Sequence, residues 1–209
     1  MQKKIIKEIL TYLEIPIGLI AGILITITQA IYVRDVYRKK VKPSVLSWVG
    51  WALLLGTGIG AQIIEEGWDW SQSGIMLAAF GCGAISITAI FSKNFTLERK
   101  DWLFLLIGLV CLLIYTISKD AWITTLFAIL ADFVIGVPTL KKAYYNPQSE
   151  QSIAWKFSLS TWTLSLVICF HHGLIYALFP VYLFLYVLVL MYFIYWRKTV
   201  SELKYTKTV

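Results

Sequence analysis

The sequence predicts an all-α integral membrane protein with seven transmembrane helices. Hydrophobic residues make up 58% of its 209 residues and charged residues only 15%, whereas soluble domains carry roughly 25% charged residues. Seven apolar stretches approach the length of about 20 residues that a membrane span requires. The Lys and Arg residues are also distributed very unequally between the two sides of these stretches.

The predicted spans cover residues 15–33, 44–64, 73–91, 102–118, 121–138, 152–170 and 174–196. A basic, amphipathic segment, residues 1–14, precedes the first span. Because the apolar run that follows has no small-residue cleavage site, we interpret it as an uncleaved helix rather than a signal peptide. Pro138 is expected to end or kink the fifth span, and Pro180 to interrupt the seventh. Residues 197–209 form a cytoplasmic tail.

The placement of the basic residues predicts the orientation of the chain. The N-terminus and the second, fourth and sixth loops hold 4 of the 19 Lys and Arg, and the other loops with the C-terminus hold 15. Since cytoplasmic loops carry the excess of Lys and Arg, the N-terminus is expected outside and the C-terminus in the cytoplasm. The net charge of +7 is therefore interpreted as a topology signal rather than as nucleic-acid binding. We expect a multi-pass protein of a bacterial plasma (inner) membrane.

An internal repeat divides the chain into two parts. Residues 31–50 align without a gap on residues 138–157, so that Tyr37 falls on Tyr144 and Trp48 on Trp155. This predicts two three-helix bundles, residues 15–91 and 121–196, joined by a linker, residues 92–120, that contains the fourth span. The extra crossing gives both bundles the same orientation, so the predicted architecture is 3+1+3 with parallel repeats.

Asp132 is the leading candidate for a functional residue. It lies in the apolar stretch 126–136, with no basic residue within eight positions on either side. A carboxyl group at this depth costs several kcal/mol unless it is paired, protonated or hydrated. Two interpretations stay open: a protonated or hydrogen-bonded Asp that fixes helix packing, or a group facing a wet cavity that binds substrate or carries a proton.

A polar and aromatic helix face accompanies this carboxyl group. Its residues in the sixth span recur every three or four positions, and the repeat matches them to a similar face in the second span. The two faces comprise Trp155, Ser158, Trp162 and Ser165, and Trp48, Trp51, Leu55 and Gly58 with Gln62 one turn further. Trp51 and Trp162, which lie deeper, are candidates either for a pocket or for the aromatic belt at the membrane interface. Trp48 and Trp155, next to cytoplasmic loops, are assigned to the aromatic belt at the membrane interface.

Other features point to helix packing. Gln29 in the first span is expected either to line the same cavity or to hydrogen-bond between helices. Gly56 and Gly60 have the spacing that lets helices approach closely. The sequence has no phosphate loop after a strand, no zinc-spaced Cys/His set and no nucleophile elbow. We therefore expect no enzymatic activity, no cofactor and no metal site.

Two stretches resemble the PQ-loop motif: residues 28–48, beginning Thr28-Gln29, and residues 138–155, beginning Pro138-Thr139. The whole chain is similar to the superfamily of PQ-loop proteins, SWEET sugar transporters and the KDEL receptor. Thr28 stands where that motif has Pro, and Thr139 where it has Gln. The resemblance implies two three-helix bundles joined by a linker helix, an N-terminus outside, and Pro138 as a hinge for alternating access with Gln29 beside the moving region.

These observations favour a transporter of a small polar solute that works by alternating access. Proton coupling through Asp132 is a hypothesis. The expected cavity is lined by Asp132, Gln29, Trp51, Gln62, Ser158 and Trp162, and the expected partners are a small-molecule solute and the lipid bilayer. Two alternatives are a non-transporting seven-span ligand receptor of KDEL-receptor type and a structural membrane protein. The sequence leaves the solute, the coupling ion and the oligomeric state open.

Overall fold

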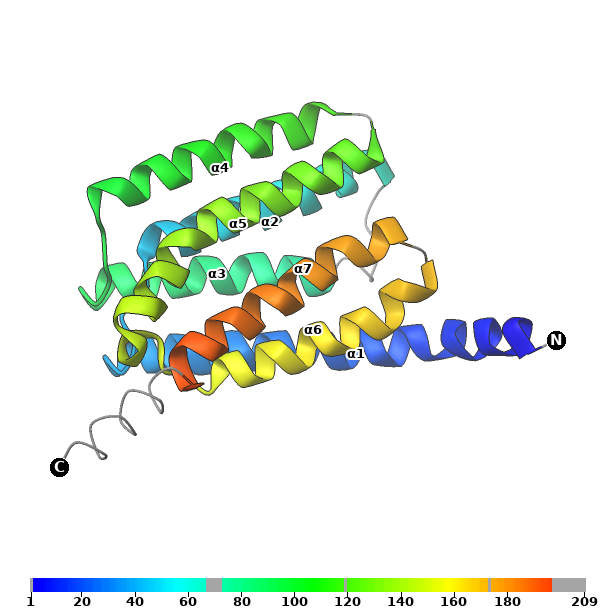
Figure 1. The fold of residues 1–209 in the computed structure, drawn as a ribbon, viewed down its shortest axis with the longest axis horizontal. Helices are drawn as coiled ribbons and strands as arrows, with labels where there is room; N and C mark the ends of the chain where they lie inside the picture. Colours follow the sequence, from blue (N-terminus) through cyan, green and yellow to red (C-terminus); the bar gives the residue numbers. More distant parts are fainter. Residues whose placement is uncertain (1, 67–72, 119, 173, 197–209) are drawn as a thin grey trace.

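The computed structural model describes residues 2–66, 73–118, 120–172 and 174–196 (Figure 1). Every regular element in these residues is helical, so the predicted all-α class is confirmed. A short 3-10 helix, η2, precedes α6, and a π-helical turn, η3, continues α7. The elements are α1 (Gln2–Tyr37), α2 (Val45–Glu66), α3 (Ser73–Phe91), α4 (Arg99–Ile117), α5 (Ala121–Tyr145), η2 (Pro147–Glu150), α6 (Ala154–His172), α7 (Leu174–Met191) and η3 (Tyr192–Trp196).

Prolines do not set the helix ends. α5 continues through Pro138 to Tyr145, and α7 continues through Pro180. The expected end of the fifth helix at Pro138 and the interruption at Pro180 are therefore wrong. A proline removes one backbone donor, and neighbouring helices can compensate when the segment is packed; Pro138 is buried in this way. Residues 2–14 are likewise continuous with the first span, because α1 runs unbroken from Gln2.

Six helices form a closed ring in the order α1, α3, α2, α5, α7, α6. In each half the third helix packs against the other two: α3 against α1 and α2, and α7 against α5 and α6. The halves meet along two interfaces, α1 with α6 and α2 with α5. α4 lies outside the ring against α5 and α2, along the upper edge of Figure 1. This order of neighbours is the one that two parallel three-helix repeats would give.

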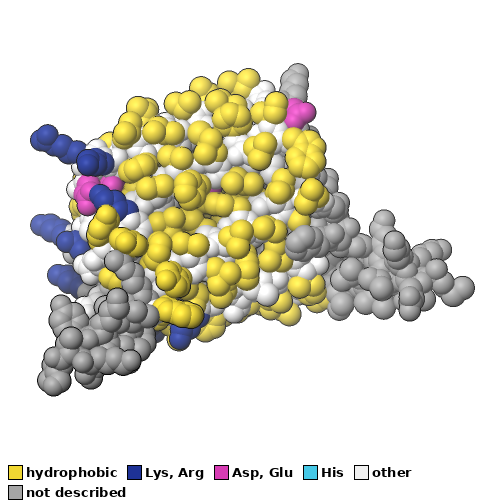
Figure 2. Space-filling view, in the orientation of Figure 1, with side chains coloured by type: hydrophobic (Ala, Val, Ile, Leu, Met, Phe, Trp, Pro, Cys, Tyr) yellow, Lys and Arg dark blue, Asp and Glu magenta, His cyan; other side chains and the backbone are white. Residues whose placement is uncertain are grey.

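The outer surface is that of a membrane-embedded protein. Four helical segments are long and apolar enough to cross a bilayer: Pro16–Tyr37, Arg99–Ile117, Trp122–Tyr145 and Ala177–Trp196. The described parts of α2 and α3 add shorter apolar segments, Val45–Gly60 and Ile75–Phe91. Figure 2 shows a broad apolar surface with Lys and Arg gathered at one end. We call this the basic end; it contains the C-terminal ends of α1, α3 and α5 and the N-terminal ends of α2, α4 and α6.

Close helix contact occurs at glycines other than those expected. In the described part of the chain, a Cβ atom added at Gly56 or Gly60 would meet nothing within 4 Å, so the packing role predicted for this pair is wrong. The Ile135 side chain of α5 instead lies against Gly50 of α2 and Gly108 of α4, where an added Cβ would come within 2.6 Å and 2.4 Å of it. These contacts hold α4 against the outside of the ring.

Candidate functional site

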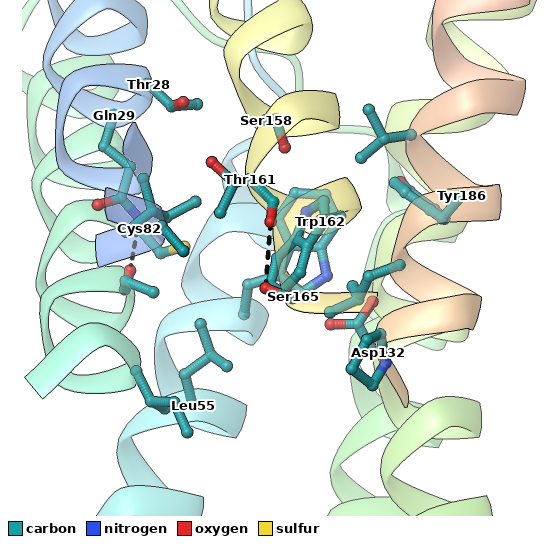
Figure 3. A pocket seen from close by; sticks show the side chains of 18 of the residues that line it. Thr28, Gln29, Leu55, Cys82, Asp132, Ser158, Thr161, Trp162, Ser165 and Tyr186 are labelled. Carbon is teal, nitrogen blue, oxygen red and sulfur yellow. Dashed lines mark hydrogen bonds between the residues drawn. The ribbon is translucent and has the colours of Figure 1, made fainter. Parts of the chain in front are cut away.

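A cavity of about 400 Å³ lies inside the ring of six helices (Figure 3). All six ring helices supply lining residues, and no described residue of α4 does. Asp132 lines the cavity and lies near the middle of the apolar segment Trp122–Tyr145. Ligand pockets in proteins measure roughly 300–1,000 Å³. The cavity therefore has the size of a small-molecule site, and its carboxyl group comes from the middle of an apolar helix.

The structure brings together five of the six residues that the sequence nominated for binding. Gln29 of α1, Trp51 of α2, Asp132 of α5, and Ser158 and Trp162 of α6 all line this one cavity. They come from both halves of the chain. Figure 3 labels four of them, Gln29, Asp132, Ser158 and Trp162, around the cavity. The side chain of the sixth residue, Gln62, lies outside the described residues.

Asp132 is buried, with 5% of its surface exposed. The Tyr182 hydroxyl of α7 donates to its Oδ2 atom over 2.6 Å. The Trp51 indole N–H faces the same carboxyl group without reaching good hydrogen-bond geometry. Both neighbours are uncharged, and no described lining residue is Lys or Arg. An ionised Asp132 therefore has no counter-ion in the described cavity, and it needs a proton, water or a cationic solute to offset its burial.

Aromatic rings form much of the remaining wall. Trp48 and Trp51 meet edge to face with centroids 5.1 Å apart and an angle of 84° between their planes. Trp51 and Tyr186 are also perpendicular, at 90° and 6.0 Å. Trp155 from the other half lies 6.1 Å from Trp48. The matched tryptophans of the repeat therefore meet at the boundary between the two halves.

The assignment of Trp48 and Trp155 to the interfacial belt is wrong. Each is only 6% exposed and belongs to the main buried cluster. The reason lies in the preceding loops, which fold back beneath the ends of α2 and α6 and bury residues such as Pro43 and Glu150. The first turn of each helix is thereby covered by protein instead of lipid headgroups. Tryptophans with half or more of their surface exposed are found elsewhere, at Trp102 and Trp196.

Three indole nitrogens of the cavity wall make no hydrogen bond of good geometry within the described residues, although the Trp48 and Trp51 N–H groups face the Tyr32 hydroxyl and the Asp132 carboxyl group. The three nitrogens belong to Trp48, Trp51 and Trp155, and each nitrogen is fully buried. An unmade hydrogen bond at a buried donor costs about 1–3 kcal/mol. Because each nitrogen has almost no exposed surface, these donors belong to the packed wall and are not presented to a ligand in the cavity.

Gln29 serves both of the roles that the sequence left open. It lines the cavity, and its Nε2 atom donates to the Ala78 carbonyl of α3 over 2.8 Å. The side chain fits because Gly81 leaves space for it: a Cβ there would lie 1.8 Å from the Gln29 Oε1 atom. α1 and α3 are thereby held together through a residue of the cavity wall.

This contact makes a specific stability prediction. We expect Gly81→Ala to displace Gln29, break its bond to Ala78 and lower the free energy of unfolding by roughly 1–3 kcal/mol, the usual cost of overpacking. Gly83→Ala is the matched control in the same helix, because a Cβ at Gly83 meets nothing within 4 Å. Thermal unfolding of both variants in one detergent tests the prediction. Equal midpoints for the two would contradict it.

The second half makes a reciprocal contact. Tyr186 of α7 donates to the Gly136 carbonyl of α5 over 3.0 Å, and a Cβ at Gly136 would lie 2.7 Å from the Tyr186 hydroxyl. Gly136 is the repeat equivalent of Gln29. In the first half the large polar side chain, Gln29, belongs to the first helix, α1. In the second half the large polar side chain, Tyr186, belongs to the third helix, α7. Sequence reasoning missed Tyr182 and Tyr186, although their four-residue spacing after Pro180 places both on one helix face.

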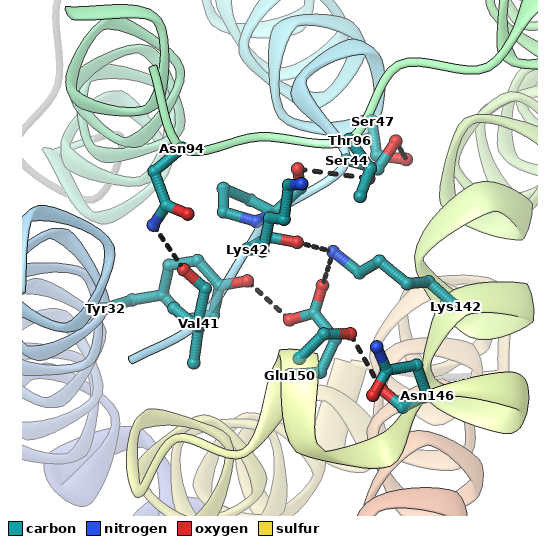
Figure 4. Close-up of polar contacts among 12 residues, drawn as sticks. Tyr32, Val41, Lys42, Ser44, Ser47, Asn94, Thr96, Lys142, Asn146 and Glu150 are labelled. Atoms are coloured by element: carbon teal, nitrogen blue, oxygen red, sulfur yellow. Dashed lines mark hydrogen bonds and ion pairs between the residues drawn. The ribbon is translucent and has the colours of Figure 1, made fainter. Parts of the chain in front are cut away.

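The cavity is closed toward the basic end by contacts that join the halves (Figure 4). Tyr32 of α1 packs against Trp48 and Trp155 with centroids 4.7 Å and 5.6 Å away. Its hydroxyl donates to Glu150 of the second half over 2.5 Å. Glu150, which has no exposed surface, also pairs with Lys142 at 2.5 Å. Lys142 in turn donates to the Lys42 carbonyl of the first half.

Two further hydrogen bonds cross between the halves at this end. The Ser152 hydroxyl donates to Asp35 Oδ2 over 2.8 Å, and the Lys42 backbone N–H donates to the Ser149 carbonyl over 2.8 Å. We call this set of contacts, together with those of Tyr32, Lys142 and Glu150, the basic-end closure. It separates the cavity from the basic end by an aromatic layer followed by a buried ion pair.

Comparisons of this chain with protein-family models, with curated proteins and with solved structures found no match. The chemistry of the cavity and of the basic-end closure is therefore the basis for the function of this chain.

Proposed function

We propose that this chain is a seven-span membrane transporter that moves a small polar solute by alternating access. The observation that carries the proposal is the cavity between the two halves, which holds a buried carboxyl group at mid-depth and is closed at one end by contacts between the halves. A site between two repeats that rock against each other needs both features: groups that bind a solute, and a closure that can open.

The resemblance to PQ-loop proteins supplies the finer parts of the proposal. We place the N-terminus outside and the C-terminus in the cytoplasm of a bacterial plasma (inner) membrane, so that the basic end is cytoplasmic. The cavity would then be closed toward the cytoplasm. Pro138 lies in α5 between Asp132 of the cavity and Lys142 of the closure. A hinge at Pro138 could therefore change the closure while the wall near Asp132 stays in place.

The two alternatives have less support from the cavity. A receptor for a peptide end would need cations to bind a carboxylate, and no described lining residue is Lys or Arg. A protein whose polar groups serve only helix packing would need no space between them. The volume of about 400 Å³ and the buried Asp132 carboxyl group, which has no counter-ion among the described lining residues, argue for an occupant instead.

Cysteine accessibility tests alternating access without knowledge of the solute. We expect Ser158→Cys, in a chain whose native cysteines are replaced by Ala, to react with a membrane-impermeant thiol reagent from either face of sealed vesicles. Ser158 is buried in the cavity wall, so two-sided reaction requires the cavity to open in turn to each side. Labelling in right-side-out and in inside-out vesicles, followed by mass shift, measures both rates.

The matched control is Ser160→Cys. Ser160 lies two residues further on the same helix, and its exposed side chain does not line the cavity, so it would face lipid. It should react from neither side, because lipid disfavours the thiolate. Labelling of Ser158→Cys from one side alone would contradict transport and favour the receptor alternative.

A further inference from the structure

One wall of the cavity is aromatic and stands beside a single acid. Trp48 and Tyr186 each stand perpendicular to Trp51, so these three rings form adjoining walls. The Asp132 carboxyl group lies at the same place, facing the Trp51 N–H and bonded to Tyr182. Perpendicular aromatic walls next to a carboxylate provide both attractions that an organic cation can use: the negative faces of the rings and a full opposite charge.

We infer that the transported solute is a small organic monocation with an apolar body, such as a substituted ammonium ion. The inference rests on the proposed transport function and specifies its substrate class. The ammonium group would lie among Trp48, Trp51 and Tyr186 and pair with Asp132.

Other solute classes fit the cavity less well. An anion or a zwitterion would bring a carboxylate or phosphate for which no described lining residue offers a cation. A sugar needs several planar polar side chains to pair its hydroxyls. The described lining contains two, Asp132 and Gln29, and the Gln29 amide N–H is already bonded to Ala78. The hydroxyls of Thr28, Thr161 and Ser165 likewise donate to carbonyls of their own helices.

The same carboxyl group would also determine what is exchanged for the cation. A buried Asp132 without a cation is best neutralised by a proton, because an unpaired charge is costly at this depth. Binding of the cation then releases that proton, so charge is conserved in the site and one proton moves against one monovalent cation. Asp132 thus alternates between the two partners and is never left ionised and unpaired.

Matched ligands separate charge from shape. We expect choline, tetramethylammonium or tetraethylammonium to quench the tryptophan fluorescence of the full chain in nanodiscs at pH 7.5. Choline should bind at least about tenfold more tightly than 3,3-dimethylbutan-1-ol, its uncharged isostere, because the isostere lacks the charge that both the rings and the acid attract. Glucose and glycine betaine complete the panel as neutral and zwitterionic probes.

Variants test the assigned groups. Asp132→Asn should weaken the cation by about tenfold or more, and Trp51→Leu should do so independently, while Trp51→Phe keeps a ring and retains more of the affinity. Glu98→Gln, which removes an exposed carboxylate at the basic end, should change nothing. Net uptake of radiolabelled choline down its gradient into proteoliposomes, with external pH recorded, should release one proton to the outside for each cation taken up.

The outcomes distinguish the inference from the transport proposal. Equal affinity for choline and its isostere, tighter binding of glucose or glycine betaine, or failure of all three cations would overturn the cation assignment. The transport proposal would then still stand if Ser158→Cys reacts from both faces. Cation binding with one-sided labelling would overturn transport and the proton exchange together, and leave a cation receptor.

Discussion

Glu150→Ala should lower the free energy of unfolding by about 3–5 kcal/mol, the cost of removing one partner from a buried ion pair. Glu150 has no exposed surface and the Lys142 side chain is 11% exposed, so the remaining ammonium group would stay buried without its carboxylate. The substitution also removes the acceptor of the Tyr32 hydroxyl. Chemical or thermal unfolding in detergent, read by tryptophan fluorescence, measures the loss.

The chain contains a matched control for this prediction in the preceding lysine. Lys141 pairs with Glu98 at 2.7 Å, but both side chains are well exposed, at 39% and 58%. Exposed pairs contribute little because water and salt screen them, so Lys141→Ala, which leaves the Glu98 cap of α4 in place, should leave the unfolding midpoint almost unchanged. The double variant Glu150→Leu with Lys142→Met should regain much of the stability that Glu150→Ala loses. Similar losses for Lys141→Ala and Glu150→Ala would contradict a buried pair.

Weakening the basic-end closure should also change the ratio of the rates at which Ser158→Cys is labelled from the two faces. Tyr32 and Lys142 each bond across the boundary between the halves, and Glu150 connects them. In the repeat, Lys142 is the equivalent of Asp35, which bonds Ser152 of the opposite half. Asp35 and Lys142 therefore occupy equivalent positions with opposite charge, and each bonds to the opposite half of the chain. Such a set of hydrogen bonds can break and reform as a unit, as a closure between rocking halves requires.

Local sequence patterns predicted the parts of the fold and site that depend on short-range periodicity. The bounds of the third predicted span, residues 73–91, are those of α3. The three- and four-residue spacing of Trp155, Ser158, Trp162 and Ser165 placed all four in one cavity wall. Asp132 was identifiable because a carboxyl group in an apolar helix is costly and thus conspicuous.

The basic-end closure could not be predicted in the same way, because its partners are distant in the chain. Tyr32 and Glu150 are 118 positions apart, and Glu150 lies in a polar stretch that looks like a solvated loop. Its burial follows from the fold of the loop beneath α6, which also covers Trp155. Short-range periodicity carries no information on where a loop folds. The burial of Trp48 and Trp155 by the loops before α2 and α6 therefore could not be predicted from it.

Asp132→Asn should remove the pH dependence of alternating access. In the unaltered cavity, we expect the ratio of Ser158→Cys labelling rates from the two faces to change by about tenfold or more between pH 5 and pH 8, because an ionised Asp132 disfavours a closed, dry cavity. Asn has the same shape and no charge, so the ratio should stay constant across this range. The measurement is the one described for Ser158→Cys, repeated at each pH.

The other titratable groups near Asp132 do not predict such a change. Tyr182 and Tyr186 of α7 and Cys82 of α3 face it, and α4 contributes Cys111 and Tyr115 on the far side of α5 and α2. Cysteine and tyrosine ordinarily titrate near about 8.5 and 10, above the pH range used. Tyr182→Phe is the matched control: it removes the hydrogen bond but keeps the carboxyl group, so the pH dependence should persist. An Asp132→Asn protein with the labelling profile and transport of the parent at every pH would exclude a proton role for this residue and leave Asp132 as a packing group.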